Sequence, residues 1–556
     1  MPRPSHAHPT PEPDDSHAGT ARAVRRVSGL TVLSRVAGLV RDLVTVRIFG
    51  DTAVGSAFAA AFAIPNLFRR LFGEGALSAA FLPAYARLLK DDAPAAHQIA
   101  SLVVGLLAII TGVLTLLGGG ALVALVVALP DDPERSFSLL LVAAMLPYMP
   151  LICVAAILGG MLQAHGRFGP WAAAPIILNL CILAASAPFF AIDGADPRRW
   201  AFYIAAAVLA AGVIQVAWSL RALRGCAAWT RRFDAARAEA RDLLRRILPA
   251  LVGLGTLQLN AMLDTLIAMW PNWVGPTMLG RDYPLDEAAN AVLFYAQRLY
   301  QFPLGVFGIA VATVVFPQLA RASTDPAAFV RTLRNGLRLS LFIALPASLG
   351  LALVRDDLVQ TVYTGFGTGF SAEGVARAAS VVLGYSVAIW SYSLVHVFTR
   401  AFYATGDTTS PMRIAIGTVA LNLTLNLILI WPLAEAGLAW STAASSIVQC
   451  VLLARLARRR LLSAPVLDRD ASAAIARTIV ATASMGVTVL LVLLVMPDRD
   501  TWGAHAAALA GSIAAGAGVY AIVSRALGAP ELAWLLARNS SPAAPPADEP
   551  DDANAP

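Results

Sequence analysis

The sequence has little charge and few residues that could hold a metal or act as a nucleophile. Only 14% of its 556 residues are charged, whereas 58% are apolar. Its four cysteines share no metal-ligand spacing, and the HExxH, CxxC and P-loop patterns of zinc, redox and nucleotide sites do not occur. These absences argue against an enzyme, an ATPase or a metal centre. The composition is also too apolar for an ordinary soluble domain.

Apolar runs long enough to cross a bilayer recur along the chain. A spanning helix needs about 20 mostly apolar residues, and the sequence predicts an all-α integral membrane protein with fourteen spans. The run at 339–354 is short, so we expect it to extend into its flanks. The spans are predicted near residues 27–49, 57–84, 99–129, 137–162, 171–192, 200–220, 247–270, 288–320, 339–354, 376–404, 412–432, 437–454, 473–497 and 503–524.

Basic residues are distributed unevenly between the predicted loops. With the amino terminus assigned to the cytoplasm, most of the 42 Lys and Arg residues fall in cytoplasmic segments. This asymmetry is the one expected for an even number of spans with both termini inside. The net charge of +7 therefore reflects topology and does not indicate nucleic-acid binding. The opposite loops carry Arg135, Arg198, Arg199, Arg281, Arg355 and Arg499. Two arginines at helix ends, Arg377 and Arg477, are expected to reach the membrane interface.

Two segments of the chain echo each other. FLPAYAR at 81–87 and VFPQLAR at 315–321 share an apolar-Pro-x-x-Ala-Arg pattern, six spans apart. Parallel repeats of this kind occur in transporters with a central site between two lobes; chance similarity in a biased composition is the alternative. We expect a disordered tail (1–26), an amino-terminal lobe (27–225), a basic linker (226–246), a carboxy-terminal lobe (247–460), two added spans (473–527) and a disordered tail (539–556). The basic loop at 221–246 either sets topology or forms an amphipathic surface helix around 231–246.

Arginines inside apolar spans are the strongest functional signal. A cation in the bilayer core is costly and rarely faces lipid, so it marks a cavity, a partner or a substrate path. At 100° per residue, Ser34, Arg35, Arg41 and Asp42 share one stripe of the first span. Within that stripe, Asp42 can hold an arginine in place. The arginines of this kind are Arg35, Arg41, Arg47, Arg69, Arg70 and Arg298.

The second and eighth spans carry the remaining members of this arginine group. Arg70 and Glu74 are four residues apart, the pairing distance on a helix, and Pro65 makes the second span bendable. A structural ion pair is the alternative reading of Arg70 and Glu74. Arg298 lies among aromatic residues of the eighth span. Because guanidinium forks bind phosphate oxygens in pairs, arginines converging from two lobes predict an anionic pyrophosphate cargo.

Three segments resemble the signature sequences of the MurJ (MviN) family of lipid II flippases, in the multidrug/oligosaccharidyl-lipid/polysaccharide exporter superfamily. They are SRVAGLVRD, AIPNLFRRLFGEGALSAAFLPAY and YAQRLYQFPLGVFGIAVATVVFPQLAR, and the resemblance extends from about residue 25 to 530. It implies an inner-membrane protein that moves the undecaprenyl-pyrophosphate-linked peptidoglycan precursor to the outer leaflet. The family's cavity residues match Ser34, Arg35, Arg41, Asp42, Arg69, Arg70, Glu74 and Arg298. The sequence departs from the family at Ser56, Ala63 and Gln297, where many members carry an acid, a lysine and an aspartate.

An isolated acid, Asp264, lies in the seventh span. Asn422 and Asn426 share a face of the eleventh span, and Thr442 lies in the twelfth. Oxygen ligands from three helices suit Na⁺, a hard cation, and the resemblance implies a similar site, with Leu438 in the same candidate group. A protonated packing acid with interhelical asparagines is the alternative. Apart from Na⁺ as a coupling or structural ion, no cofactor is expected.

The sequence is compatible with several functions. The favoured one is lipid II translocation by alternating access, with the lipid tail in a groove beside the last two spans. The alternatives are a flippase for another polyprenyl-pyrophosphate sugar, a multidrug–cation antiporter, and a non-transporting membrane scaffold. The expected partners are the lipid substrate and membrane lipids, with no nucleic acid. We expect a monomer that contacts the cell-wall synthesis machinery.

Overall fold

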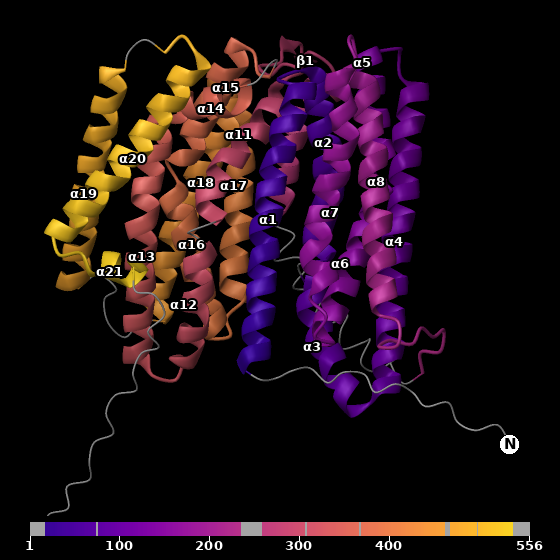
Figure 1. Ribbon diagram of the computed structural model, residues 1–556, viewed down its shortest axis with the longest axis horizontal. Helices are drawn as coiled ribbons and strands as arrows, with labels where there is room; N and C mark the ends of the chain where they lie inside the picture. Colours follow the sequence, from indigo (N-terminus) through magenta and orange to yellow (C-terminus); the bar gives the residue numbers. More distant parts are fainter. Residues whose placement is uncertain are drawn as a thin grey trace, which may run out of the picture.

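The computed structural model describes residues 17–73, 76–234, 258–305, 309–365, 369–461, 468–496 and 499–536, and its helices run back and forth between two faces (Figure 1). The elements are α1 (His17–Phe49), α2 (Ala53–Phe68), the π-helix η1 (Arg69–Gly73), α3 (Ala76–Asp91), α4 (Ala93–Ala128), α5 (Pro133–Met145), α6 (Tyr148–Ala164), α7 (Gly169–Ser186), the 3₁₀-helix η2 (Ala187–Ala191), α8 (Pro197–Ala222), α10 (Trp270–Trp273), β1 (Thr277–Met278), β2 (Arg281–Asp282), α11 (Ala289–Pro303), α12 (Ile309–Arg321), α13 (Pro326–Leu353), α14 (Arg355–Thr364), α15 (Ala372–Ser386), α16 (Ile389–Ala404), α17 (Thr409–Leu433), α18 (Glu435–Arg460), α19 (Arg469–Val495), α20 (Trp502–Ala526) and α21 (Pro530–Leu536).

The predicted all-helical membrane architecture is confirmed. Among the described residues, nine helices are long and apolar enough to span a bilayer, and the bent pair α15–α16 makes a tenth. The spans predicted at 27–49, 57–84 and 288–320 correspond to α1, α2–η1–α3 and α11–α12, which carry arginines or breaks. The span predicted at 247–270 is described only from residue 258, as a helical segment over 258–268. The short run at 339–354 extends back to Pro326 as α13.

Several of these helices begin at an N-cap aspartate that is followed by a proline. Asp132, Asp196 and Asp325 each accept a hydrogen bond from backbone N–H groups of the first turn of α5, α8 and α13. Each is followed directly by a proline, whose missing N–H costs nothing at a helix start. The loops before these helices are short, and so they hold consecutive helices antiparallel.

The helices form two groups on either side of α1, with α19 and α20 at one edge (Figure 1). We call α1–α8 the N-lobe, since α1 packs mainly on α7, and the segment 258–268 with α10–α18 the C-lobe. Each lobe has its own buried apolar cores. Both lobes also contain a π-helical break, at Arg69–Gly73 in the N-lobe and at 304–305 in the C-lobe, which extends the echo between the two halves.

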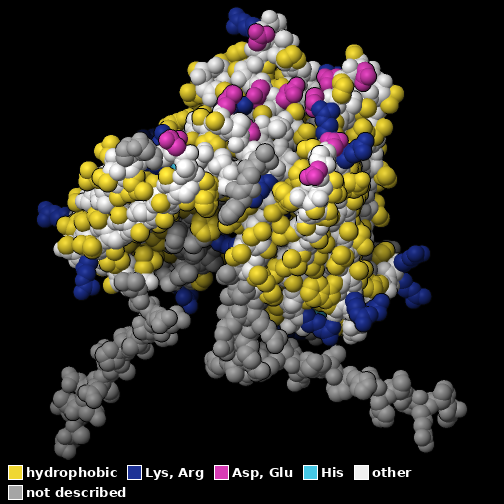
Figure 2. All heavy atoms as spheres, turned by 45° about the horizontal axis from the view of Figure 1, so that its top comes forward, with side chains coloured by type: hydrophobic (Ala, Val, Ile, Leu, Met, Phe, Trp, Pro, Cys, Tyr) yellow, Lys and Arg dark blue, Asp and Glu magenta, His cyan; other side chains and the backbone are white. Residues whose placement is uncertain are grey.

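The two faces of the helical bundle differ in charge. We call the face where α1 begins and α21 lies the terminal face, and the opposite face the distal face (Figure 1). Acidic side chains gather on the distal face, whereas most Lys and Arg side chains lie toward the other end (Figure 2). The apolar belt between them matches a membrane-embedded surface.

The added pair α19–α20 is attached to the C-lobe at both faces. On the distal face, buried Asp357 of α14 contacts His505 of α20 at 2.7 Å and Arg499 at 3.3 Å. On the terminal face, Arg338 of α13 pairs with Glu531 of α21 at 2.6 Å. Ion pairs at both ends therefore fix α19 and α20 to α13 and α14.

Arg377, which the sequence predicts to reach the membrane interface, forms a structural bridge. Its guanidinium pairs with Asp286 and with Glu435, each at 2.7 Å, and Glu435 is only 4% exposed. Charge-assisted hydrogen bonds to both acids fix the position of the Arg377 guanidinium. It therefore holds three parts of the C-lobe together.

We expect Arg377→Ala to lower the thermal unfolding temperature of the purified protein markedly. Removing one partner leaves Glu435 buried and unpaired, which costs about 3–5 kcal/mol. The double substitution Arg377→Ala with Glu435→Gln should recover much of this loss, because no buried charge remains. An Arg377→Ala protein that unfolds at the wild-type temperature would contradict this assignment.

Candidate functional site

A cavity of about 800 Å³ lies between the two lobes. Its walls come from α1, α2, η1, α6, α7 and α8 of the N-lobe and from the segment 258–268 and α11 of the C-lobe. Five arginines from both lobes line it, whereas no aspartate or glutamate of the described residues is part of its wall. The wall is therefore strongly cationic. The arginines are Arg35, Arg41, Arg69, Arg70 and Arg298.

Arg41 is held in the cavity wall by three different groups. Its guanidinium donates to Asp42 at 2.6 and 3.0 Å and to the side-chain oxygen of Asn179 on α7 at 3.0 Å. It also lies over the ring of Phe62, 5.1 Å from the centroid. Asn179 in turn donates to the backbone oxygen of Ser34. The orientation of Arg41 is thus set before any ligand arrives.

Asp42 connects the arginines of the two lobes. Besides its bonds to Arg41, its second carboxylate oxygen lies 3.8 Å from Nε of Arg298 on α11. Arg298 also lies over the ring of Phe294, at 4.6 Å. Nε of Arg298 is buried and makes no hydrogen bond within the described residues. One acid therefore holds two arginines close to each other, each still able to donate toward the cavity.

Arg69 and Arg70 lie where α2 changes into the π-helix η1. Pro65 lies one turn earlier, and Asn66 accepts a bond from Nε of Arg69 at 3.4 Å. A π-helical turn rotates the following side chains relative to a continuous α-helix, and here it presents both arginines to the cavity. Glu74, the predicted partner of Arg70, lies outside the described residues.

Arg47 lies apart from the other arginines. It does not line the cavity, and its guanidinium donates to the backbone oxygen of Gly365 after α14. Of the three positions that depart from the family pattern, Ala63 and Gln297 line the cavity. Gln297 donates to the hydroxyl of Tyr385 at 3.0 Å. Ser56 is fully buried and belongs to a contact between the lobes.

That contact joins α2 to α11 on the distal side of the cavity. The Ser56 hydroxyl accepts a hydrogen bond from the backbone N–H of Ala291 at 3.0 Å, and the Asn290 side chain donates to the Ser56 carbonyl at 2.9 Å. Nearby, the Tyr295 hydroxyl contacts that of Thr45 at 3.3 Å. These buried bonds pair polar groups that would otherwise be unsatisfied, so they hold the lobes together.

Two further contacts close the distal edge. Asp51, in the turn after α1, accepts from the backbone N–H and the hydroxyl of Ser371 at 2.9 and 2.5 Å. The indole of Trp273 donates to Ser138 of α5 at 2.9 Å. We call these contacts, with those of Ser56 and Thr45, the distal seam. Described residues of both lobes are thus joined by several hydrogen bonds at this seam, which closes the distal side of the cavity.

The candidate ion-binding residues form one chain of hydrogen bonds in the C-lobe. The Asn426 amide donates to Asp264 at 2.6 Å and to Asn422 at 3.0 Å, and the Asn422 amide donates to Thr442 at 3.2 Å. Asp264 is buried, and Leu438 is fully buried on α18. Thr424, between the two asparagines in sequence, is exposed and bonds to its own helix.

Asn179 is a cavity residue that the arginine pattern did not single out. A polar residue in an apolar span is a weaker signal than a charge, because an asparagine also serves to join helices. The useful signal was positional: Asn179 lies in span five and Asn422 in span eleven, six spans apart. In the N-lobe, Asn179 accepts a hydrogen bond from Arg41 of the neighbouring helix α1. In the C-lobe, Asn422 accepts one from Asn426, which itself donates to Asp264 of a neighbouring helix.

This arrangement, two helical lobes around a cationic cavity, defines a transporter. Among solved structures, one described as "Lipid II flippase MurJ, inward closed conformation" matches with a TM-score of 0.73 at 19% identity, covering 90% of this chain and 99% of that chain. An inward-facing multidrug resistance MATE family transporter of the MOP superfamily matches with a TM-score of 0.62 at 14% identity, covering 77% and 94%. These likenesses establish the fold, which the chain shares with both of these proteins.

Sequence comparison identifies the family within that class. The family described as "Lipid II flippase MurJ" matches residues 45–510. The "Probable lipid II flippase MurJ" of Rhizobium tropici is 33% identical over 440 residues, covering 77% of this chain and 79% of the relative. That of Rhizobium meliloti (strain 1021) is 32% identical over 525 residues, covering 92% and 94%. The chain belongs to the MurJ family. It is a multi-pass bacterial inner-membrane transporter, not an enzyme.

Proposed function

We propose that this protein translocates lipid II, the undecaprenyl-pyrophosphate-linked disaccharide-pentapeptide, from the inner to the outer leaflet of the cytoplasmic membrane. The observation that carries the proposal is the cluster of five arginines from both lobes in one cavity whose described wall residues include no acid. Guanidinium groups bind phosphate oxygens through paired, charge-assisted hydrogen bonds. The names of the relatives support the same cargo.

The distal seam supports alternating access as the mechanism. With the distal side closed, the head group would enter from the terminal face, which we assign to the cytoplasm together with both chain termini. Its pyrophosphate would displace water from Arg41, Arg69 and Arg298. Asp42 holds Arg41 and Arg298 in position by occupying some of their N–H groups. A bound pyrophosphate would compete with Asp42 for these N–H groups, and this competition would weaken the link that Asp42 makes between the lobes. Release to the outer leaflet then requires the distal seam to open.

The lipid tail would remain in the bilayer during this cycle. We propose that it follows a groove beside α19 and α20, whose outer surfaces expose large apolar side chains such as Ile479, Leu491 and Ile522. An alkyl chain lies at little cost in free energy against apolar residues or lipid. Inside the cationic cavity, the same chain would displace water and counter-ions from the arginines, which is costly. Only the head group therefore needs the cavity.

The direct test measures lipid II on the outer leaflet of cells depleted of their own flippase. Expression of this protein should restore the exposed fraction of lipid II and cell growth. Failure of a well-expressed protein to restore exposure would reject lipid II as cargo and favour another polyprenyl-pyrophosphate-linked oligosaccharide. The same assay with an O-antigen precursor then identifies that alternative. If neither lipid moves, the protein is a non-transporting member of the family.

We also propose that Asp264, Asn422, Asn426 and Thr442 can hold Na⁺. The fit rests on Oδ1 of Asn426, which is buried and makes no hydrogen bond within the described residues. An unpaired amide oxygen beside a buried carboxylate is a suitable oxygen donor set for a hard cation. A bound Na⁺ would supply positive charge that balances Asp264, and these four residues would link three helices of the C-lobe.

We expect Na⁺, but not K⁺, to raise the unfolding temperature of the wild-type protein and to leave Asp264→Ala unchanged. Binding to the folded state alone adds about 2.7 kcal/mol of stability when the ligand is at 100 times its Kd. Thr424→Ala is the matched control, because this side chain lies near the site in sequence but is exposed. Equal responses of wild type and Asp264→Ala to Na⁺ would remove the site.

A further inference from the structure

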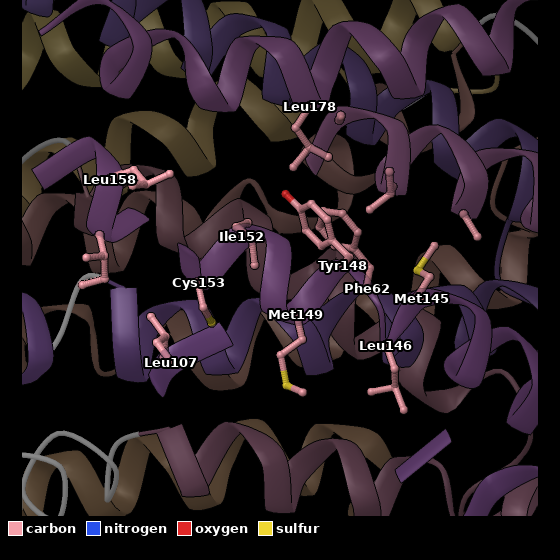
Figure 3. Close-up of a cluster of buried hydrophobic side chains, with 14 of the residues drawn as sticks. Phe62, Leu107, Met145, Leu146, Tyr148, Met149, Ile152, Cys153, Leu158 and Leu178 are labelled. Atoms are coloured by element: carbon pink, nitrogen blue, oxygen red, sulfur yellow. The ribbon is translucent and has the colours of Figure 1, made fainter. Parts of the chain in front are cut away.

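The N-lobe wall of the cavity contains a buried tyrosine hydroxyl that makes no hydrogen bond within the described part of the chain. Tyr148 is the first residue of α6, after the break at 146–147 that separates α6 from α5. Its side chain is 1% exposed, and its hydroxyl makes no hydrogen bond to the described residues. The ring packs among apolar side chains, and the hydroxyl points toward Leu178, another cavity residue (Figure 3). A buried polar group of this kind is unusual in a folded protein and calls for a ligand or a bound water.

Other neutral hydrogen-bonding groups line the same part of the cavity. Gln215 and Ser219 lie one turn apart on α8, and both are buried wall residues. The Gln215 amide nitrogen donates to the backbone oxygen of Ala174 at 2.8 Å, which fixes the side chain. Gln215 lies close to the Tyr148 hydroxyl without forming a well-aligned bond to it. Among the described residues, the Tyr148 hydroxyl is thus available to a ligand, with the Gln215 side chain beside it.

Trp171 presents an aromatic surface to the same cavity. Trp171 of α7 lines the cavity and is 42% exposed. Its ring rests on Gly159 of α6, where an added Cβ would lie 2.8 Å from Cδ1 of the indole. Pro175 has no N–H, so the carbonyl of Trp171 lacks its usual helical partner. We call Tyr148, Trp171, Gln215 and Ser219 the neutral pocket.

The neutral pocket and the arginines lie next to each other. The π-helix that carries Arg69 and Arg70 packs against α6, which begins at Tyr148. A ligand whose phosphates reach these arginines therefore has its adjoining group near the pocket. An uncharged group with hydroxyls and an amide, and with one apolar face for the indole, fits this set of side chains. Sugars with acetamido groups have this chemistry, whereas a peptide with free carboxylates would be drawn to the arginines.

We propose that Tyr148, Trp171 and Gln215 bind the sugar that is attached to the pyrophosphate of the cargo. The inference rests on the proposed lipid-linked cargo and assigns one part of it to a separate pocket. The arginines bind the anionic group common to all polyprenyl pyrophosphates. The neutral pocket distinguishes cargo with a sugar from the bare carrier lipid. A sugar can form a hydrogen bond with the buried Tyr148 hydroxyl, whereas the bare carrier leaves this hydroxyl unpaired and therefore binds less tightly.

The experiment compares two lipids on the full-length protein in lipid nanodiscs. Lipid II carries two sugars and a peptide, and undecaprenyl pyrophosphate carries the two phosphates and the tail with neither. Undecaprenyl pyrophosphate bearing one N-acetylated sugar and no peptide is measured beside them, and it should respond to each substitution as lipid II does. We expect Tyr148→Phe and Gln215→Leu each to weaken lipid II binding about tenfold, the effect of one lost hydrogen bond, and to leave undecaprenyl pyrophosphate binding unchanged. Trp171→Leu should act in the same direction through lost stacking.

Tyr392→Phe is the matched control for Tyr148→Phe. The Tyr392 hydroxyl is also buried and makes no hydrogen bond to the described residues, but Tyr392 does not line the cavity. Its substitution should change neither affinity. Unfolding temperatures measured in parallel show that each variant is folded.

The outcomes separate this inference from the proposed function. If wild type binds both lipids and Tyr148→Phe binds each as wild type does, the hydroxyl is only packed or hydrated and the neutral pocket is rejected. Equal weakening for both lipids would also reject it, because the pocket would then not contact the sugar. If wild type binds neither lipid, the proposed function itself fails and this inference falls with it.

Discussion

Alanine at Arg41 or at Arg298 will abolish lipid II exposure in flippase-depleted cells at matched expression. Each arginine contributes charge-assisted hydrogen bonds to the pyrophosphate, at about 1.5–3 kcal/mol per bond. Loss of a two-bond contact is therefore worth more than a hundredfold in binding. The effect is compounded at Arg41, because Asp42 loses a partner at 2.6 Å and keeps only Arg298 at 3.8 Å. The fraction of lipid II accessible on the outer leaflet measures the result.

Three variants separate the loss of cavity charge from misfolding. Arg281→Ala removes an exposed distal arginine and should transport as wild type does. Arg41→Ala with Asp42→Asn removes the unpaired acid and should restore stability but not transport. Arg298→Lys keeps the charge but loses the planar fork, so we expect partial activity. Restored exposure by both alanine variants would reject the arginine cavity as the transport path.

The helical period of the first span placed Ser34, Arg35, Arg41 and Asp42 on one stripe, three of whose residues supply the α1 side of the cavity wall. Ser34, Arg35 and Arg41 lie on one stripe of an α-helix, and all three line the cavity. Arg47 follows Arg41 by six residues, which turns it about 240° around the helix axis. It therefore points elsewhere and contacts Gly365. The sequence had placed Arg47 in one group with the cavity arginines, and the structure separates it from them.

Contacts between distant segments could not be predicted from the sequence. Ser56 and Ala291 meet because α2 and α11 cross on the distal side, and nothing local to either residue indicates this. The role of Tyr148 could not be predicted either, because a tyrosine in an apolar span usually packs in the core. That its hydroxyl makes no hydrogen bond to the described residues follows only from the positions of its neighbours in the structure. The bridge that Arg377 forms depends on two acids, which lie 91 and 58 residues away in the sequence.

A disulfide across the distal seam will stop transport reversibly. Asp51 of the N-lobe and Ser371 of the C-lobe are joined by hydrogen bonds of 2.9 and 2.5 Å. Cysteine at both positions places each sulfur near the present Cγ and Oγ atoms, within reach of bond formation after small adjustments. Since the distal seam must open to release cargo outward, the oxidised Asp51→Cys, Ser371→Cys protein should hold lipid II exposure at the level of depleted cells. Reductant should return it to the level of the single variants.

The single variants Asp51→Cys and Ser371→Cys control for the lost seam contacts and for the cap that Ser371 gives α15. Each weakens the distal seam without locking it, so each should transport, and the oxidant should not affect it. The pair also reports orientation: it will oxidise spontaneously in cells when the distal face lies in the oxidising periplasm, and remain reduced when that face lies in the cytoplasm. Undiminished lipid II exposure with the cross-link fully formed would mean that the lobes need not separate here, and alternating access through this cavity would be wrong.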